Sequence, residues 1–137
     1  MHEDQRVFLF VTEYQKTDLY GSTFMGNADP GTPTKIALKD SNPPKTGWRD
    51  SPSIFPNSDG HVFVAFVDGR TAAKGGRSRF TVLAPDLSQK LTDVFDVSAP
   101  DVQVLETKVV ALGPGRAMVA SLESTGTISG VTLNCPY

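Results

Sequence analysis

The sequence predicts an all-β fold, a β-propeller-type array of four-stranded antiparallel blades, with a β-sandwich as the alternative. One pattern occurs three times along the chain at an offset of 55 residues. Glycine and proline are frequent, with 12 and 10 copies, and valine and phenylalanine dominate the apolar residues. Turn signals separate the short apolar runs, so this balance favours strands and tight turns over helices.

The repeated pattern is an apolar run that follows a basic residue and ends at an acidic one. Its copies lie at Gln5–Glu13, Asp59–Arg70 and Pro114–Glu123. The basic residues are Arg6, His61 and Arg116, and the acidic residues are Glu13, Asp68 and Glu123. Units of this size cannot bury both faces of their own sheet, so neighbouring units are expected to cover one another. The chain then holds about 2.5 blades.

Length and charge exclude several classes of protein. At 137 residues the chain is expected to form a single repeat domain with one core. Its 13 basic and 15 acidic residues are scattered, and a formal charge of −2 argues against a nucleic-acid binder or a polybasic membrane surface. The only cysteine, Cys135, excludes an internal disulfide framework and a zinc cluster. We expect a half-buried thiol at a strand end, with pairing to another chain as the alternative.

The first unit, residues 5–40, is predicted to lack the first strand of a blade. Its opening run is apolar throughout, which suits a strand buried on both faces. A polar connection over 14–20 follows, and the paired prolines Pro43 and Pro44 cannot continue a ladder, so they mark the unit boundary. The expected strands are 7–12, 21–28 and 34–40.

The middle unit, residues 48–97, is predicted to be a complete blade. The Asp59-Gly60 pair is typical of a tight hairpin turn, and the apolar run after it is the expected central strand. A flexible loop is expected over 71–77, where two glycines follow small residues. The expected strands are 51–56, 61–67, 78–83 and 90–97.

The third unit, residues 100–137, is predicted to lack the fourth strand. Its expected strands are 108–112, 116–122 and 127–133. Three units cannot close a ring, because propellers have about four or more blades. The broken blades therefore predict a homo-oligomer in which copies complete one another, or a piece of a longer propeller chain.

Ser51-Pro-Ser-Ile54 followed by Asp59–Arg70 resembles the opening blade of the sialidase superfamily of propellers, where an Arg-Ile-Pro motif precedes a Phe-Ala-Glu-Gly-Arg-like strand. The resemblance covers about 20 residues and implies a propeller fold. The stretch Leu112–Ala120 also looks like the degenerate propeller repeats of secreted or surface-attached bacterial proteins. That likeness implies an extracellular, cell-surface or periplasmic location, although no signal peptide and no membrane span are visible.

The same resemblance argues against sialidase chemistry. The arginine that binds the sugar carboxylate in sialidases corresponds to Asp50 here, with Arg49 one place out of register. Side chains one residue apart face opposite sides of a strand. The loop 71–77 holds no carboxylate where the family has an acid, and Ala84–Ser88 replaces the aspartate-box turn.

Trp48 is the only tryptophan and is the main candidate for a sugar-binding platform. Aromatic rings stack on sugar rings, and the adjacent Arg49 and Asp50 would add hydrogen bonds. Packing within or between blades is the alternative role, and the equivalent position in the third unit is Gln103. The residues best suited to contact a ligand are Trp48, Arg49, Asp50, Asp68 and Arg70.

The remaining polar residues are expected to be structural. His61 shares the position of Arg6 and Arg116, and no Gly-x-Ser-x-Gly elbow accompanies it, so no catalytic triad is placed. The three repeated acids are expected to be solvated or paired with a neighbouring arginine. Asp93, Asp96 and Asp101 lack calcium-loop spacing, and we predict no metal and no cofactor. The basic cluster Lys74, Arg77 and Arg79 is expected to be solvated.

These observations favour a binding or assembly module without catalysis, acting through rim loops or through edge strands. Its partner would be a protein ligand, a glycan or another copy of the chain. The first alternative is a carbohydrate-binding lectin centred on Trp48. The second is a fragment of a sialidase-like glycoside hydrolase whose catalytic residues lie elsewhere.

Overall fold

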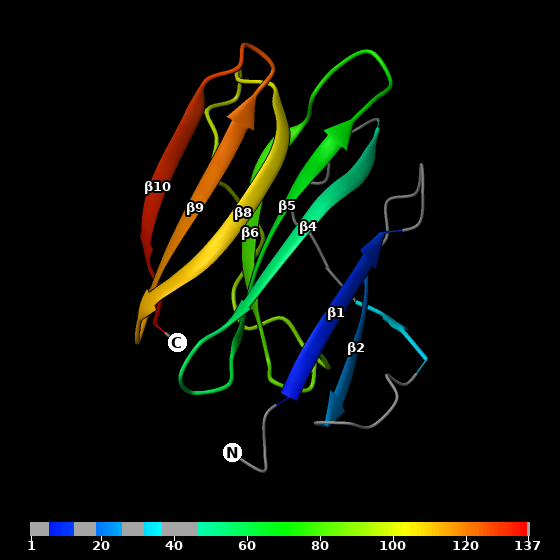
Figure 1. Ribbon diagram of the computed structural model, residues 1–137, viewed down its shortest axis with the longest axis vertical. Coiled ribbons are helices and arrows are strands. Elements are labelled where there is room, and N and C mark those ends of the chain that lie inside the picture. The colour runs from blue at the N-terminus through cyan, green and yellow to red at the C-terminus, as the bar shows by residue number, and fades with distance from the viewer. Residues whose placement is uncertain (1–5, 13–18, 26–31, 37–46, 137) are drawn as a thin grey trace.

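The computed structural model describes residues 6–12, 19–25, 32–36 and 47–136, and the regular structure in these ranges consists of ten β-strands (Figure 1). The all-β prediction is therefore confirmed. The strands form three antiparallel sheets, and within each sheet the strands pair in the order of the sequence. The first sheet contains β1 (Arg6–Thr12), β2 (Leu19–Met25) and β3 (Thr34–Lys35).

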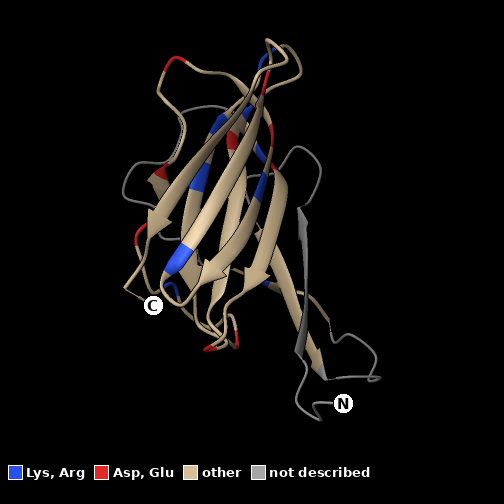
Figure 2. Cartoon of the chain, turned by 60° about the vertical axis from the view of Figure 1, so that its left-hand side comes forward, with Lys and Arg blue, Asp and Glu red and all other residues tan. Residues whose placement is uncertain are grey.

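The other two sheets contain four and three strands. The middle sheet consists of β4 (Trp48–Pro56), β5 (Val62–Arg70), β6 (Arg77–Leu83) and β7 (Phe95–Asp96). The third sheet consists of β8 (Val104–Gly113), β9 (Arg116–Glu123) and β10 (Ile128–Asn134). Acidic residues lie mainly in loops and at strand ends, whereas long stretches of the strands are uncharged (Figure 2). Within the described residues no sheet closes on itself, and face-to-face packing of open sheets fits the β-sandwich alternative.

The middle sheet lies between the other two and is covered on both faces (Figure 1). Side chains of β5 alternate between two cores, because successive residues of a strand point to opposite faces. Val64 and Phe66 pack with residues of the first sheet, whereas Phe63 and Ala65 pack with residues of the third. Full burial of each such valine or phenylalanine contributes roughly 1.5–3 kcal/mol. The covering residues are Leu19 and Ile36 on one side, and Val109, Ala117 and Val119 on the other.

Polar contacts also join the middle sheet to the third. The backbones of Gly76 and Val104 exchange two hydrogen bonds of 2.8 and 2.9 Å, which attaches the β5–β6 loop to the start of β8. The hydroxyls of Ser78 and Thr107 lie 3.0 Å apart in a buried position. Each pairing satisfies groups that would be costly to bury alone, so the two sheets are fixed in register as well as packed.

Strand β4 is irregular where it passes the end of β5. Its register against β5 shifts between Trp48 and Asp50 and again between Asp50 and Ser53. Ser51 has a φ of 51°, an uncommon conformation for a residue with a side chain. Such bulges re-aim the side chains beside them. They lie at the residues that the sequence singled out as ligand contacts.

Six strands begin within one residue of their predicted starts: β1, β3, β5, β6, β9 and β10. Strands β4 and β8 begin earlier than predicted, because Trp48 pairs with Arg70 and the Gly76 backbone pairs with Val104. Strand β2 begins at Leu19, inside the expected 14–20 connection. The rest of that connection, like 26–28 and 37–40, lies outside the described residues.

The prediction of a fourth strand over 90–97 is wrong for most of its length. Only Phe95–Asp96 forms β7. The Thr92 side chain takes the place of a ladder partner, since its hydroxyl accepts a hydrogen bond from the Val82 backbone at 3.0 Å. A side chain that competes for backbone groups interrupts regular pairing, so this edge is short.

Candidate functional site

The five predicted ligand-contact residues lie together at one end of the middle sheet. Trp48, Arg49 and Asp50 open β4, and Asp68 and Arg70 close β5. The antiparallel register brings the ends together, since Trp48 is the cross-strand partner of Arg70. The sequence therefore grouped residues that the fold does bring together.

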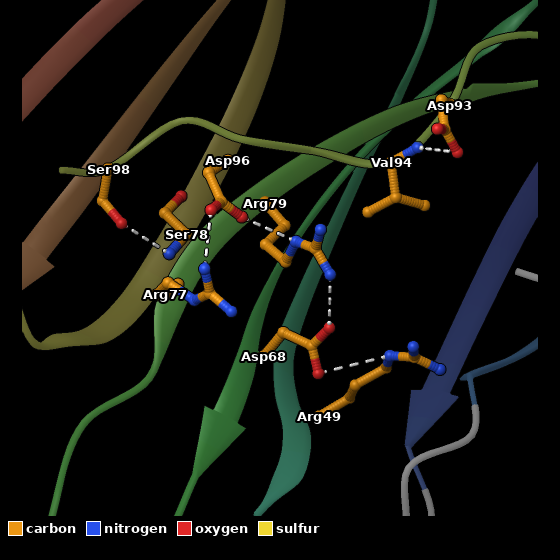
Figure 3. A network of polar contacts seen from close by, with 9 residues as sticks. All are labelled: Arg49, Asp68, Arg77, Ser78, Arg79, Asp93, Val94, Asp96 and Ser98. Carbon is orange, nitrogen blue, oxygen red and sulfur yellow. Dashed lines mark hydrogen bonds and ion pairs between the residues drawn. The ribbon is translucent and has the colours of Figure 1, made fainter. Parts of the chain in front are cut away.

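Asp68 is the centre of a buried ion-pair network (Figure 3). Its side chain is 1% exposed, and Oδ2 accepts a hydrogen bond of 3.1 Å from Nη1 of Arg79. Oδ1 lies 3.4 Å from Nε of Arg49. The Arg49 guanidinium also lies 5.7 Å from the ring centroid of Phe66, on the side that faces the first sheet. Both oxygens of the carboxylate thus face guanidinium groups.

The network continues outward through Arg79 to the edge of the sheet (Figure 3). Nε of Arg79 lies 2.9 Å from Oδ1 of Asp96, and Nη1 of Arg77 donates to Oδ2 of Asp96 at 2.8 Å. Three guanidinium groups therefore surround two carboxylates, Asp68 and Asp96. A buried arginine is tolerated when it is paired in this way, because charges without partners are costly to desolvate.

Arg79 corrects the prediction of a solvated basic cluster. Its side chain is only 2% exposed and is the largest fully buried one in the described part of the chain. Arg79 lies on the same face of β6 as Arg77 but further from the end of the strand, since the β5–β6 register pairs Arg79 with the fully buried Phe66. Arg77 is partly buried, and Lys74, in the loop, is exposed as predicted.

A second ion pair lies on the side of the middle sheet that meets the third. Nη1 of Arg70 donates to Oδ2 of Asp50 at 2.6 Å and to the backbone oxygen of Leu105 at 3.0 Å. Oδ1 of Asp50 accepts a hydrogen bond of 2.7 Å from the Ser51 backbone, which stabilises the bulge. Both charged side chains are partly exposed. The five predicted residues therefore split into a buried group and an accessible group.

Glycines let the backbone segments at this end approach closely. A Cβ atom on Gly47 would lie 2.5 Å from the Arg70 backbone oxygen, and Gly47 has a φ of 94°. A Cβ atom on Gly76 would collide with the backbone oxygen of Asp68. Neither position has room for a side chain, so these glycines hold the loops against the end of β5.

No family model matches the chain, and no match was found among curated proteins or among solved structures.

The chemistry available at this end of the sheet follows from exposure and pairing. Asp68 faces two guanidinium groups and is buried, so it is poorly placed to exchange protons with a substrate. Trp48 is half-buried, and Asp50 and Arg70 are partly exposed beside it. This accessible group offers an aromatic surface, a carboxylate and a guanidinium, which suit hydrogen bonding to a polar ligand.

Other candidate residues lie away from this end or outside the described part. His61 is half-buried at the β4–β5 turn, and its backbone oxygen accepts a hydrogen bond of 2.8 Å from Asn57. Glu123 ends β9 and makes backbone contacts in the following turn, whereas Glu13 lies outside the described residues. Asp68 follows the expectation of pairing with an arginine.

Cys135 follows the end of β10 as a half-buried free thiol, as predicted. It packs at the margin of the core between the middle and third sheets, and burial raises the pKa of its thiol. Among the described residues, no group of three or more His, Cys, Asp or Glu side chains is arranged to hold a metal. No helix in that part of the chain is long and apolar enough to cross a membrane.

Sequence reasoning did not assign Arg79 and Asp96 to the buried network. The signal was the hairpin register, because cross-strand pairing places Arg79 one diagonal step from Asp68. Asp96 then follows as the cross-strand partner of Arg79 in β7. The bulge at Asp50 gives no such signal, because a register shift leaves the apolar pattern of the flanking strand unchanged.

Proposed function

We propose that this chain is a non-catalytic assembly module of the propeller type, which associates with a second copy of itself. One observation carries the proposal: the face of the third sheet that points away from the middle sheet is largely apolar, and no other sheet of the described residues packs on it. Met118 is 38% exposed and Ile128 is 76% exposed on that side. Exposed apolar faces of this kind mark sites of protein association.

The arrangement of the sheets supports a propeller-type stack. Each sheet is built from strands that follow one another in sequence, and successive sheets pack face to face. The 55-residue offset relates Phe63 of β5 to Met118 of β9 and Asp68 to Glu123. Successive blades of a propeller have these relations, and three of them need further sheets to complete a ring.

Pairing within the buried network supports a role without catalysis. A general acid or base needs access to its substrate. Asp68 lacks that access, since its side chain is 1% exposed and both carboxylate oxygens face Arg49 and Arg79. The network is better suited to holding β4, β5 and β6 together at their ends.

The test is the mass of the chain in solution at rising protein concentration, measured by light scattering. We expect a mass of twice the 14.7 kDa chain. A monomer at every protein concentration would contradict the assembly proposal. Larger masses that grow without limit would point to open-ended stacking in place of a closed assembly.

A second candidate function is glycan binding by the accessible group of Trp48, Asp50 and Arg70. The observation that favours it is their common location at one end of the middle sheet with part of each side chain exposed. Screening the chain on a glycan array beside the Trp48→Ala variant tests this function. Binding by the wild-type chain that the variant loses would support glycan binding, whereas the absence of binding by both proteins would contradict it.

A further inference from the structure

One face of the third sheet packs on the middle sheet, and the other points away from it. We use the name outward face for the residues that alternate along β8, β9 and β10 with those in the core. Cross-strand pairing places Val110 beside Met118 and Leu122 beside Ile128, so apolar residues adjoin on this face. Its members are Val110, Met118, Ala120, Leu122, Ile128, Gly130 and Thr132, with the charged residues Glu106, Lys108 and Arg116 at the margin.

A hollow of about 270 Å³ lies in the outward face. Ala120 and Gly130 are cross-strand partners, and neither has a side chain large enough to fill the space above the sheet. Leu122 and Ile128 form one wall of the hollow. Lys108 and Glu106 stand at its rim, joined by an ion pair of 2.9 Å. An apolar hollow with a charged rim matches the anatomy of a docking site for a large side chain.

The middle sheet shows what such a face binds. At the 55-residue offset, Phe63 and Ala65 of β5 occupy the positions of Met118 and Ala120. Phe63 and Ala65 are fully buried, because the next sheet along the chain packs on them. The outward face continues the same stack by one step. The layer that fits it is therefore another sheet with an apolar face.

The first sheet of a second copy offers that layer. Leu19 of β2 points into the core beside the middle sheet, so Tyr20 and Phe24 alternate to the opposite side of the strand. Both aromatic residues are half-buried within one copy. In the β1–β2 register, Phe24 pairs with Val7 and Tyr20 pairs with Val11. The end of the stack therefore has aromatic residues of a size suited to the hollow.

We infer that the outward face binds the first sheet of a second copy, with an aromatic side chain of β2 entering the hollow over Ala120. This inference rests on the proposed self-assembly and names its interface. Two copies related by a two-fold axis make this contact twice. Six sheets then form a closed ring, within the four to eight blades that propellers contain.

The test uses two variants of the full chain and one control, all measured by light scattering. Met118→Lys places a charge in the outward face, and Phe24→Lys places one on the first sheet. Each homodimer would lose both contacts, so we expect its dissociation constant to rise by about a hundredfold or more. Thr125→Lys changes an exposed residue of the β9–β10 turn and should leave the dimer intact. Circular dichroism and thermal unfolding show whether each variant remains folded.

Mixing the two variants separates this geometry from other ways of dimerising. A mixed dimer of Met118→Lys with Phe24→Lys keeps one of its two contacts undamaged, so we expect dimer mass to return at concentrations where each variant alone is monomeric. If Phe24→Lys alone stays fully dimeric, the first sheet is not the occupant. If Met118→Lys stays dimeric, the outward face is not the interface, although self-assembly itself would stand. Ala120→Trp fills the hollow and is an independent test. An unchanged dissociation constant of the dimer would contradict docking in the hollow.

A wild-type chain that is monomeric at every concentration overturns the assembly proposal together with this interface. That outcome is distinct from a wild-type dimer that tolerates Met118→Lys, which overturns the interface alone.

Discussion

Strands β5 and β9 have the same pattern 55 residues apart, yet they lie in different surroundings. Every residue of β5 from Val62 to Asp68 is buried, because a sheet packs on each face. In β9 the residues that face the middle sheet are buried, whereas Met118 on the other face is 38% exposed. The apolar pattern is thus alike in both strands, and the number of covering sheets differs.

The same apolar pattern therefore forms a strand with two covered faces in β5 and with one covered face in β9. Ala117 and Val119 hold the same core role as Val62 and Val64, each on the face toward the preceding sheet. The opposite faces are both apolar, but another sheet packs only on that of β5. Substitutions made in pairs, one in each strand, therefore measure what the second layer of cover contributes.

The largest expected contrast is between Phe63→Ala and Met118→Ala. Phe63 is fully buried, so truncation should cost about 3–5 kcal/mol through lost burial and the cavity left behind. Its ring lies 5.8 Å from that of Phe80, a pair whose loss adds about 1 kcal/mol. Met118→Ala should cost less than about 1 kcal/mol, because much of its side chain already faces water.

Urea unfolding of both variants measures this contrast. The lowest workable protein concentration is needed, since association of native chains would add to apparent stability. Equal costs at the two positions would mean that the outward face is covered even in a single chain.

The next contrast compares the acids that end the two strands. Asp68→Ala leaves Arg49 and Arg79 buried with their shared carboxylate removed, which should cost about 3–5 kcal/mol. Glu123→Ala at the equivalent position should change stability by no more than about 0.5 kcal/mol, because its side chain is partly exposed. Thermal unfolding of the pair provides the measurement. A mild effect at Asp68 would show that Asp96 alone can hold Arg79.

Strands β5 and β9 are also examples of elements that the sequence pattern predicts. Residues 62–67 and 117–122 are apolar over the length of a strand and are bounded by turn residues. A strand at each of these places can therefore be predicted from the local pattern. The clustering of Trp48 with Arg70 also followed, because a tight Asp-Gly turn sets the hairpin register.

Other features depend on contacts that local pattern does not contain. Arginine is normally a surface residue. Arg79 can be buried because its charge is paired with those of Asp68 and Asp96. The early end of the fourth strand depends on the Thr92 hydroxyl, which takes a backbone partner from the ladder. Both depend on polar contacts made by side chains, which hydropathy alone does not predict.

A smaller contrast is expected between two glycines. An alanine at Gly76 would collide with the backbone oxygen of Asp68, so Gly76→Ala should cost about 1–3 kcal/mol as the loop moves away from β8. At Gly130 the nearest atom to a new Cβ is the Val119 backbone oxygen at 4.0 Å. Gly130→Ala should therefore raise stability by up to about 0.5–1 kcal/mol, because alanine loses less backbone entropy in a strand. Urea unfolding distinguishes the two signs, and a loss of stability at Gly130 would mean that another layer already contacts it.

The smallest effect is expected at the second ion pair, Asp50–Arg70, which we compare with the buried Asp68 network of the same sheet. Asp50→Asn removes the charge that binds Arg70 at 2.6 Å but keeps a side chain able to accept from Ser51. Because both partners are partly exposed, the cost should be about 0.2–1 kcal/mol and should shrink as salt is added. The buried Asp68 network should respond little to salt, since solvent ions do not reach it. Unfolding curves of Asp50→Asn and Asp68→Ala at low and high salt compare the two. If both respond alike, the exposure of the ion pairs is not what separates the accessible group from the buried one.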